Sequence, residues 1–118
     1  MRTAEESAIL LAYLLKRSGE TRVRVSEKTI RKVAQRSYIR TAFVDMLSLH
    51  LEDLGLNIMQ LERGGYGLIR ASVLEGAPTV TAKSLLQDVL RELKKNKNHI
   101  KTIRDEVEGD VASDDDDE

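Results

Sequence analysis

The chain has 118 residues, of which 41% are apolar and 3% are aromatic, and it contains no cysteine and no tryptophan. This length predicts one globular domain with an appendage, and the missing cysteines exclude disulfides and thiolate metal sites. The formal net charge of -1 conceals an acidic end, because residues 105–118 hold nine acids and no base, which leaves 19 basic against 11 acidic residues before them, or +8.

The first predicted element is a helix over residues 4–17. Thr3 and Glu6 have the spacing of a capping box, in which the side chain of each residue accepts a hydrogen bond from the backbone amide of the other. Leucine and isoleucine follow at helical intervals, and Gly19 ends the helix. A short strand over residues 22–25 comes next, because arginine alternates with valine there.

Two further helices are predicted before the middle of the chain. Ser26 is a suitable cap for a helix that ends near Arg36, and the spacing of its apolar residues gives that helix one inner stripe. From Tyr38 onward, apolar residues recur at helical intervals as far as Gly55, a suitable left-handed C-cap. The third helix is therefore expected to be long.

Residues 56–74 are predicted to form a β-hairpin. Two apolar runs flank Gly64 and Gly65, and paired glycines suit the positive backbone angles of a tight two-residue turn. Because one hairpin buries too little apolar surface to fold alone, we expect it to pack on the preceding helices.

The order helix, short strand, helix, helix, hairpin over residues 4–74 resembles the winged helix-turn-helix superfamily. The segment IRKVAQRSYIRTAFVDML is similar to the helix-turn-helix pattern, with Ala34 at the close-packing position and Tyr38 where the bacterial pattern commonly has glycine. The resemblance implies a mainly α (α+β) fold with a winged helix-turn-helix domain over residues 1–74. It also implies that the third helix lies in the major groove of DNA and that the hairpin is a wing.

A cluster of basic residues surrounds the predicted helix-turn-helix. Residues 16–40 hold nine bases against two acids, a local charge of +7 that is typical of polyanion binding, although charge runs also form solvated faces. An arginine at the start of a groove-bound helix can read base edges, and basic residues around it can neutralise phosphates. The predicted DNA-binding residues are Arg22, Arg24, Lys28, Arg31, Lys32, Arg36, Ser37, Tyr38, Arg40, Thr41, Arg63, Tyr66 and Arg70.

Alternatives stay open for three of these residues. Tyr38 and Tyr66 are equally compatible with partial core packing beside a hydrated hydroxyl. Arg70 is slightly more compatible with an edge charge that discourages strand pairing than with a DNA contact.

After a connector over residues 75–81, residues 82–107 are predicted to form one helix. Apolar residues there alternate spacings of four and three, the a/d repeat of a coiled coil, with one polar position that can fix the register. The residues expected to join a homodimer are Leu86, Val89, Leu93, Asn96, Ile100 and Ile103. The alternative is a helix folded back on its own domain, since periods of 3.5 and 3.6 are hard to separate over this length.

Residues 108–118 are predicted to be a disordered acidic tail, because their like charges repel and they contain few apolar residues. One role for such a tail is solubility. The other is mimicry of nucleic acid, in which the tethered tail occupies the basic surface until DNA displaces it.

Two functional hypotheses follow. The first is a DNA-binding protein, a small dimeric transcription regulator that contacts double-stranded DNA and is autoinhibited by its tail. The second is a winged-helix module that binds a protein partner within a larger complex. We expect no catalytic residue, no metal site and no cofactor, because neither His50 nor His99 has a nucleophile or ligand at a suitable spacing. Since no apolar run is long enough to span a membrane, a cytoplasmic or nucleoid-associated location is expected.

Overall fold

A computed structural model describes the backbone of residues 1–116 and the side chains of residues 1–109. The chain divides into two compact units, Met1–Ala77 and Pro78–Glu118. Within the described residues, no helix combines the length and the apolar character that crossing a lipid bilayer requires.

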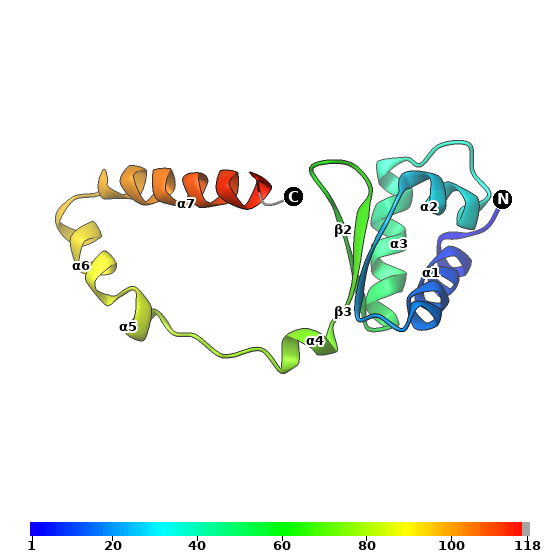
Figure 1. Ribbon diagram of the computed structural model, residues 1–118, viewed down its shortest axis with the longest axis horizontal. Helices are drawn as coiled ribbons and strands as arrows, with labels where there is room; N and C mark the ends of the chain where they lie inside the picture. Colours follow the sequence, from blue (N-terminus) through cyan, green and yellow to red (C-terminus); the bar gives the residue numbers. More distant parts are fainter. Residues whose placement is uncertain (117–118) are drawn as a thin grey trace. The chain divides into compact units, whose positions relative to one another are not determined.

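The first unit is a mixed α and β domain in which helices pack against one face of a small antiparallel sheet (Figure 1). In chain order its elements are α1 (Ala4–Ser18), β1 (Arg22–Val25), α2 (Glu27–Ala34), α3 (Thr41–Asp53), β2 (Leu56–Gln60), β3 (Tyr66–Arg70) and α4 (Ser72–Glu75). The expected α+β class and the expected order of helices and strands are both confirmed for this unit.

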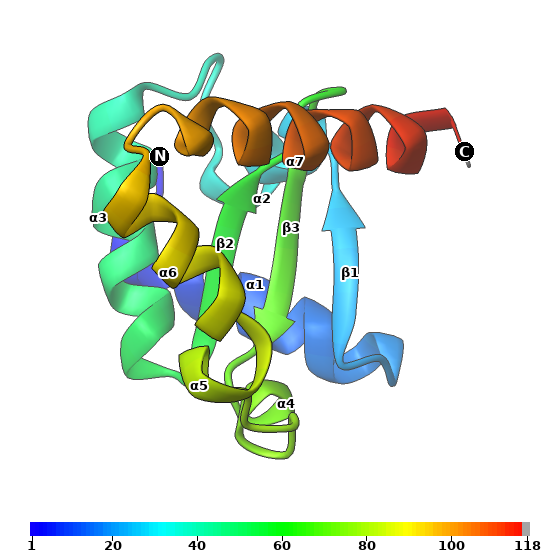
Figure 2. The ribbon, with the colours of Figure 1, turned by 90° about the vertical axis from the view of Figure 1, so that its left-hand side faces the viewer.

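The sheet has the strand order β1-β3-β2, with β3 in the centre and antiparallel to both neighbours (Figure 2). Leu68 on β3 lies opposite Val23 on β1 and opposite Ile58 on β2. Since successive side chains of a strand point to opposite faces, these three share the face that packs against the helices.

The core is mainly aliphatic, with Phe43 and Tyr66 as its aromatic members. Within each helix the buried residues recur every three or four positions, so that each helix turns one apolar stripe inward. The buried apolar residues are Ala4, Ala8, Leu11, Leu15, Val25, Ile30, Ala34, Phe43, Leu47, Leu51, Leu56, Tyr66 and Leu68.

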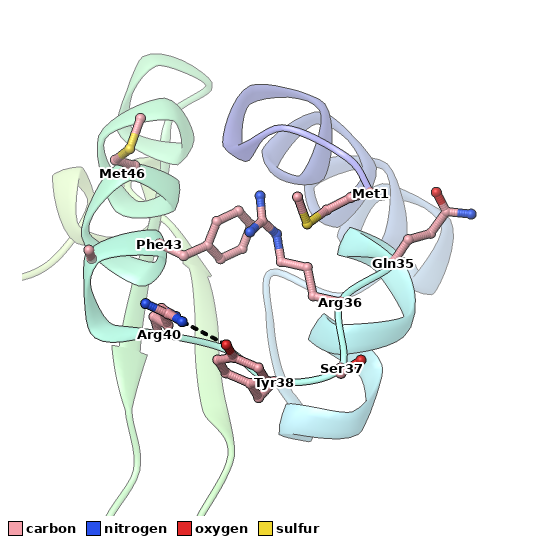
Figure 3. A pocket seen from close by; sticks show the side chains of 9 residues that line it. Met1, Gln35, Arg36, Ser37, Tyr38, Arg40, Phe43 and Met46 are labelled. Carbon is pink, nitrogen blue, oxygen red and sulfur yellow. Dashed lines mark hydrogen bonds between the residues drawn. The ribbon is translucent and has the colours of Figure 1, made fainter.

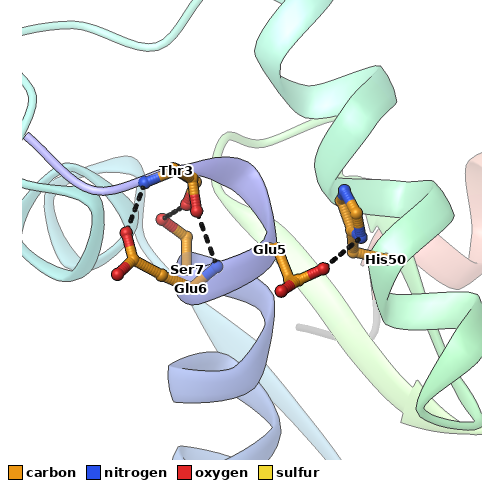
Figure 4. Close-up of polar contacts among 5 residues, drawn as sticks. All are labelled: Thr3, Glu5, Glu6, Ser7 and His50. Atoms are coloured by element: carbon orange, nitrogen blue, oxygen red, sulfur yellow. Dashed lines mark hydrogen bonds and ion pairs between the residues drawn. The ribbon is translucent and has the colours of Figure 1, made fainter.

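The capping box predicted for α1 is confirmed (Figure 4). The Oγ1 atom of Thr3 accepts a hydrogen bond from the backbone amide of Glu6 at 3.1 Å, and the Oε1 atom of Glu6 accepts one from the amide of Thr3 at 2.9 Å. Ser7, which is fully buried, donates its hydroxyl to the carbonyl of Thr3 at 2.8 Å. The first turn of α1 is therefore held by polar contacts at its surface and beneath it.

The hairpin is confirmed, but its predicted two-residue turn is wrong. The amide of Leu61 donates to the carbonyl of Gly65 at 3.0 Å, and the amide of Gly64 donates to the carbonyl of Leu61 at 3.1 Å, which leaves residues 62–64 as the loop. Gly64 and Gly65 both have positive φ, at 100° and 75°, because a three-residue loop needs left-handed backbone where it rejoins the strand.

Two predicted boundaries in the first unit are also wrong. The third helix begins at Thr41 and not at Tyr38, because Arg40 has extended backbone, with φ -87° and ψ 151°. The hairpin ends at Arg70, after which the chain forms the short helix α4 and not more strand.

In the second unit, the single helix predicted over residues 82–107 is wrong. The structure has α5 (Ala82–Leu85), α6 (Gln87–Lys95) and α7 (His99–Asp116) in its place. Asn96 has extended backbone, and its side-chain Oδ1 accepts a hydrogen bond from the amide of Asn98 at 3.1 Å. Such local side-chain bonds compete with helical ones, so the asparagines end α6.

This break changes the expected dimerisation seam. Asn96 lies outside the helices and Leu86 lies between α5 and α6. Val89 and Leu93 belong to α6, whereas Ile100 and Ile103 belong to α7. A continuous coiled coil through all six residues is therefore wrong.

The disordered tail is likewise wrong for residues 108–116, where α7 continues to Asp116. Extending an existing helix adds a hydrogen bond per residue without a new nucleation cost. In addition, the Nε atom of Arg104 donates a hydrogen bond to the Oε1 atom of Glu108, one turn later in α7, at 2.9 Å. The prediction for residues 117–118 lies outside the described residues.

Candidate nucleic-acid interface

Helix α2 carries the most continuous basic face of the first unit. Ser26 caps it by accepting a hydrogen bond from the amide of Thr29 at 3.1 Å. The apolar stripe of Ile30 and Ala34 then faces the core, which leaves Lys28 and Lys32, one turn apart, exposed on the outside. Both side chains, which the sequence predicted to contact DNA, are accessible on this face.

Arg31, on the same helix, is half-buried, and its Nη1 atom donates to the backbone carbonyl of Ser37 at 3.4 Å. The side chain therefore helps to fix the turn between α2 and α3.

Strand β1 carries two further exposed arginines. Arg22 and Arg24 alternate with Val23 and Val25, so they project from the face of the sheet that the helices leave open. The strand leads directly into α2, and Gly65 of the hairpin loop lies against Val25 and Ser26. The hairpin loop, the end of β1 and the start of α2 are thus brought together, with exposed Arg63 on that loop.

The side chain of Arg36, in the turn between α2 and α3, has two partners. Its guanidinium carbon lies 3.9 Å from the centroid of the Phe43 ring, and its Nη2 atom donates to the carbonyl of Arg2 at 3.0 Å. Arg2 in turn donates its Nη1 to the carbonyl of Val33 at 2.8 Å. Arg36 thereby ties the N-terminal segment to α3.

Tyr38 and Arg40 form a surface pair ahead of α3 (Figure 3). The Nη2 atom of Arg40 donates to the Tyr38 hydroxyl at 2.7 Å, and the guanidinium lies 5.2 Å from the ring centroid. Tyr38 is 60% exposed, so it is a surface residue and not the core residue considered as an alternative. Ser37 and Thr41 beside them are exposed as well.

Two predicted contact residues on the hairpin are placed elsewhere. Tyr66 is only 8% exposed and belongs to the core, so assigning it to DNA contact was wrong. Arg70 stands at the opposite end of β3 from the loop, beside a shallow groove lined by Ile9, Tyr13 and Leu54. Arg63 and Arg70 therefore do not form one surface.

The exposed side of α3 lacks positive charge along its length. No lysine or arginine occurs between Thr41 and Asp53. The exposed residues on this side beyond the first turn are Asp45, Met46, Leu49, Glu52 and Asp53. Met46 and Leu49 are 55% and 63% exposed. This acidic and apolar face was visible in the sequence as a gap in the basic cluster, but the prediction overlooked it.

Histidine and acidic side chains are the candidate metal ligands. Among the described residues, no group of three or more His, Asp or Glu side chains is placed to hold a metal ion. The Nδ1 atom of His50 on α3 faces the Oε2 atom of Glu5 on α1 at 4.0 Å (Figure 4). This contact links α1 and α3.

Comparisons of the chain with protein-family models, with curated proteins and with solved structures find no match.

Proposed function

We propose that the first unit is a winged helix-turn-helix domain that binds double-stranded DNA, and that the protein is a small dimeric transcription regulator. The domain assignment is supported by the element order α1-β1-α2-α3-β2-β3 and by the strand order β1-β3-β2. In this proposal the hairpin of β2 and β3 is the wing.

The observation that carries the proposal is the set of exposed cations on the consecutive elements β1 and α2, called the basic surface below. Lys28 and Lys32 on α2 and Arg22 and Arg24 on β1 are all exposed. Exposed cations on adjoining elements match the spaced negative charges of a phosphate backbone. Arg63 on the loop extends this surface beyond the start of α2.

Recognition of bases is assigned to the first turn of α3 alone. Arg40 and Thr41 are exposed there, and a guanidinium can donate two hydrogen bonds to a guanine edge. Farther along, Asp45 would face phosphates of like charge. We therefore infer that α3 enters the groove end-on.

The second unit supplies dimerisation and autoinhibition in this proposal. Leu86, Leu90 and Ile100 are exposed apolar residues on or beside short helices, which are marginally stable unless something covers them. A second copy of the unit would cover them. The acids of residues 105–118 then compete with DNA for the basic surface.

The test is fluorescence anisotropy of a labelled DNA duplex titrated with three full-length proteins at several salt concentrations. These are the wild type, a variant with the acids of residues 114–118 changed to Asn or Gln, and the double variant Lys28→Gln, Lys32→Gln. We expect binding that weakens with salt, tightens on tail neutralisation and weakens in the lysine variant. No binding by any of them at low salt would overturn the proposal.

A specific observation favours a second candidate, the protein-interaction module. Met46 and Leu49 lie exposed together on α3 among acids, a combination that suits a basic amphipathic partner. The neutral double variant Met46→Gln, Leu49→Gln separates the two functions, because it removes the apolar pair without adding charge that would itself attract DNA. Under the DNA proposal this variant keeps its affinity for duplex DNA, whereas under the module proposal it loses a protein partner that the wild type captures in stoichiometric amount.

A further inference from the structure

A hollow of about 570 Å³ opens on the surface where α2 turns into α3 (Figure 3). Its walls combine guanidinium groups with apolar and aromatic side chains. The lining residues that matter here are Arg36, Tyr38, Arg40, Phe43 and Met46. Its volume lies in the range of about 300–1,000 Å³ that small-molecule sites occupy.

The hollow is electropositive and has no built-in counter-charge. Neither Asp nor Glu contributes to its lining. The Nε atom of Arg36 is buried without a hydrogen-bond partner, and Arg40 donates to the neutral hydroxyl of Tyr38. Helix α3 begins at this wall without a side-chain cap, so the partial positive charge of its N-terminus adds to the field.

The same hollow has an apolar half. The Phe43 ring stacks under the Arg36 guanidinium, and the side chains of Tyr38 and Met46 are largely exposed beside it. A bare inorganic anion would leave these apolar surfaces in water. A ligand with both an acidic group and an apolar body would use the whole lining.

We propose that this hollow binds a small organic anion, with its acidic group at the guanidinium groups of Arg36 and Arg40 and its apolar body against Tyr38 and Met46. The site goes beyond DNA binding, because it takes a diffusible ligand. Since Tyr38 and Arg40 also belong to the candidate DNA surface, an occupied hollow and bound DNA exclude each other, and the ligand acts as an effector.

The experiment is a nuclear magnetic resonance titration of the ¹⁵N-labelled full chain with three probes. Phenyl phosphate carries both chemical features, inorganic phosphate carries only the anion, and benzyl alcohol carries only the aromatic ring. We expect phenyl phosphate to shift the amides of residues 36–43 in a saturable way, with at least about tenfold tighter binding than either single-feature probe, because the ring adds buried apolar area.

Two variants locate the site. Arg40→Gln removes one guanidinium from the hollow and should weaken phenyl phosphate binding about tenfold, which is the loss of one charge-assisted contact. Lys16→Gln, at an exposed position on α1, removes the same charge outside the hollow and should leave binding unchanged. The spectra of both variants report directly whether the fold is intact.

Several outcomes would overturn the proposal. Equal affinity for phenyl phosphate and inorganic phosphate would mean a simple anion site, and equal affinity for benzyl alcohol would mean an apolar surface. Shifts that are absent, or that centre on residues other than 36–43, would also refute it. A separate titration with duplex DNA distinguishes this proposal from the proposed function. If the protein binds phenyl phosphate but not DNA, the proposed function is refuted and the ligand site is not.

Discussion

The guanidinium group of Arg36 lies flat against the ring of Phe43, with 3.9 Å between the guanidinium carbon and the ring centroid. Through its bond to the carbonyl of Arg2, the same side chain holds the N-terminal segment at the turn. Arg36, a residue of the basic cluster, therefore stabilises the fold in addition to any ligand that it binds.

We expect Arg36→Ala to lower the free energy of unfolding by about 2 kcal/mol, because it removes a cation–π contact and a charge-assisted hydrogen bond. Urea denaturation followed by circular dichroism measures this. Lys32→Ala, at an exposed position on α2, is the matched control and should change stability by less than about 0.5 kcal/mol. Equal effects of the two substitutions would refute the structural role of Arg36.

Two leucines on α3 offer a second matched pair. Leu47 is fully buried, whereas Leu49 is 63% exposed. We expect Leu47→Ala to cost about 3 kcal/mol through lost burial and a residual cavity, and Leu49→Ala to cost less than about 0.5 kcal/mol. Thermal or urea denaturation compares them. A large loss from Leu49→Ala would show that this face is covered in solution.

The glycines of the hairpin differ in the space around them. A Cβ atom at Gly65 would lie 2.8 Å from the carbonyl oxygen of Val25, whereas nothing lies within 4 Å at Gly64. Both have positive φ, so each Ala substitution costs about 1 kcal/mol in backbone strain, and at Gly65 the collision with β1 should bring the total to about 3 kcal/mol. Similar unfolding midpoints for the two variants would contradict this placement of the hairpin.

The capping box makes stability depend on acid pH. The backbone amide of Thr3 first, and then its side chain, hold the pKa of Glu6 below its ordinary value of 4.5. Ionised Glu6 therefore stabilises the folded state fully above that ordinary value, and its contribution fades as pH falls through the lowered pKa. Wild type should be more stable than Glu6→Gln at neutral pH, and the difference should shrink below about pH 4. A difference that stays constant down to about pH 3 would be inconsistent with the box.

If α2 meets phosphates, its lysines should set the salt dependence of DNA binding. For Lys28→Gln with Lys32→Gln, we expect the slope of log K against log salt concentration to become shallower by about 2, roughly one for each lost contact. Lys94→Gln with Lys95→Gln, on α6, removes the same charge from the other unit and is the control. Identical slopes for both double variants would place the phosphate contacts elsewhere.

Local signals made most of the first unit predictable. The capping residues Thr3 and Ser26 mark helix starts, and the alternation of valine and arginine marks β1. The start of α3 was not predictable from spacing, because Ile39 packs against the core from the turn and fits the helical pattern without belonging to the helix. Only the three-dimensional packing separates the two cases.

The candidate site was predictable in composition but not in arrangement. Clustering in sequence identified Lys28 and Lys32, yet the stacking of Arg36 on Phe43 depends on how α2 and α3 cross. Tyr66 was wrongly assigned to DNA contact. It lies two positions before the buried Leu68 on β3, so its side chain points to the same inward face. In the second unit the apolar residues recur at helical spacing, but the asparagines at 96 and 98 interrupt the single helix that this spacing predicted.

The central position of β3 has a consequence for the order in which the domain assembles. Its pairing with β2 closes only a short loop, which forms at little entropic cost. Its pairing with β1 must bridge the whole of α2, α3 and β2, so we expect it to form later. Strand β1, with Arg22 and Arg24, is then expected to be the last strand to join the sheet, so that the complete basic surface forms only in the fully folded domain.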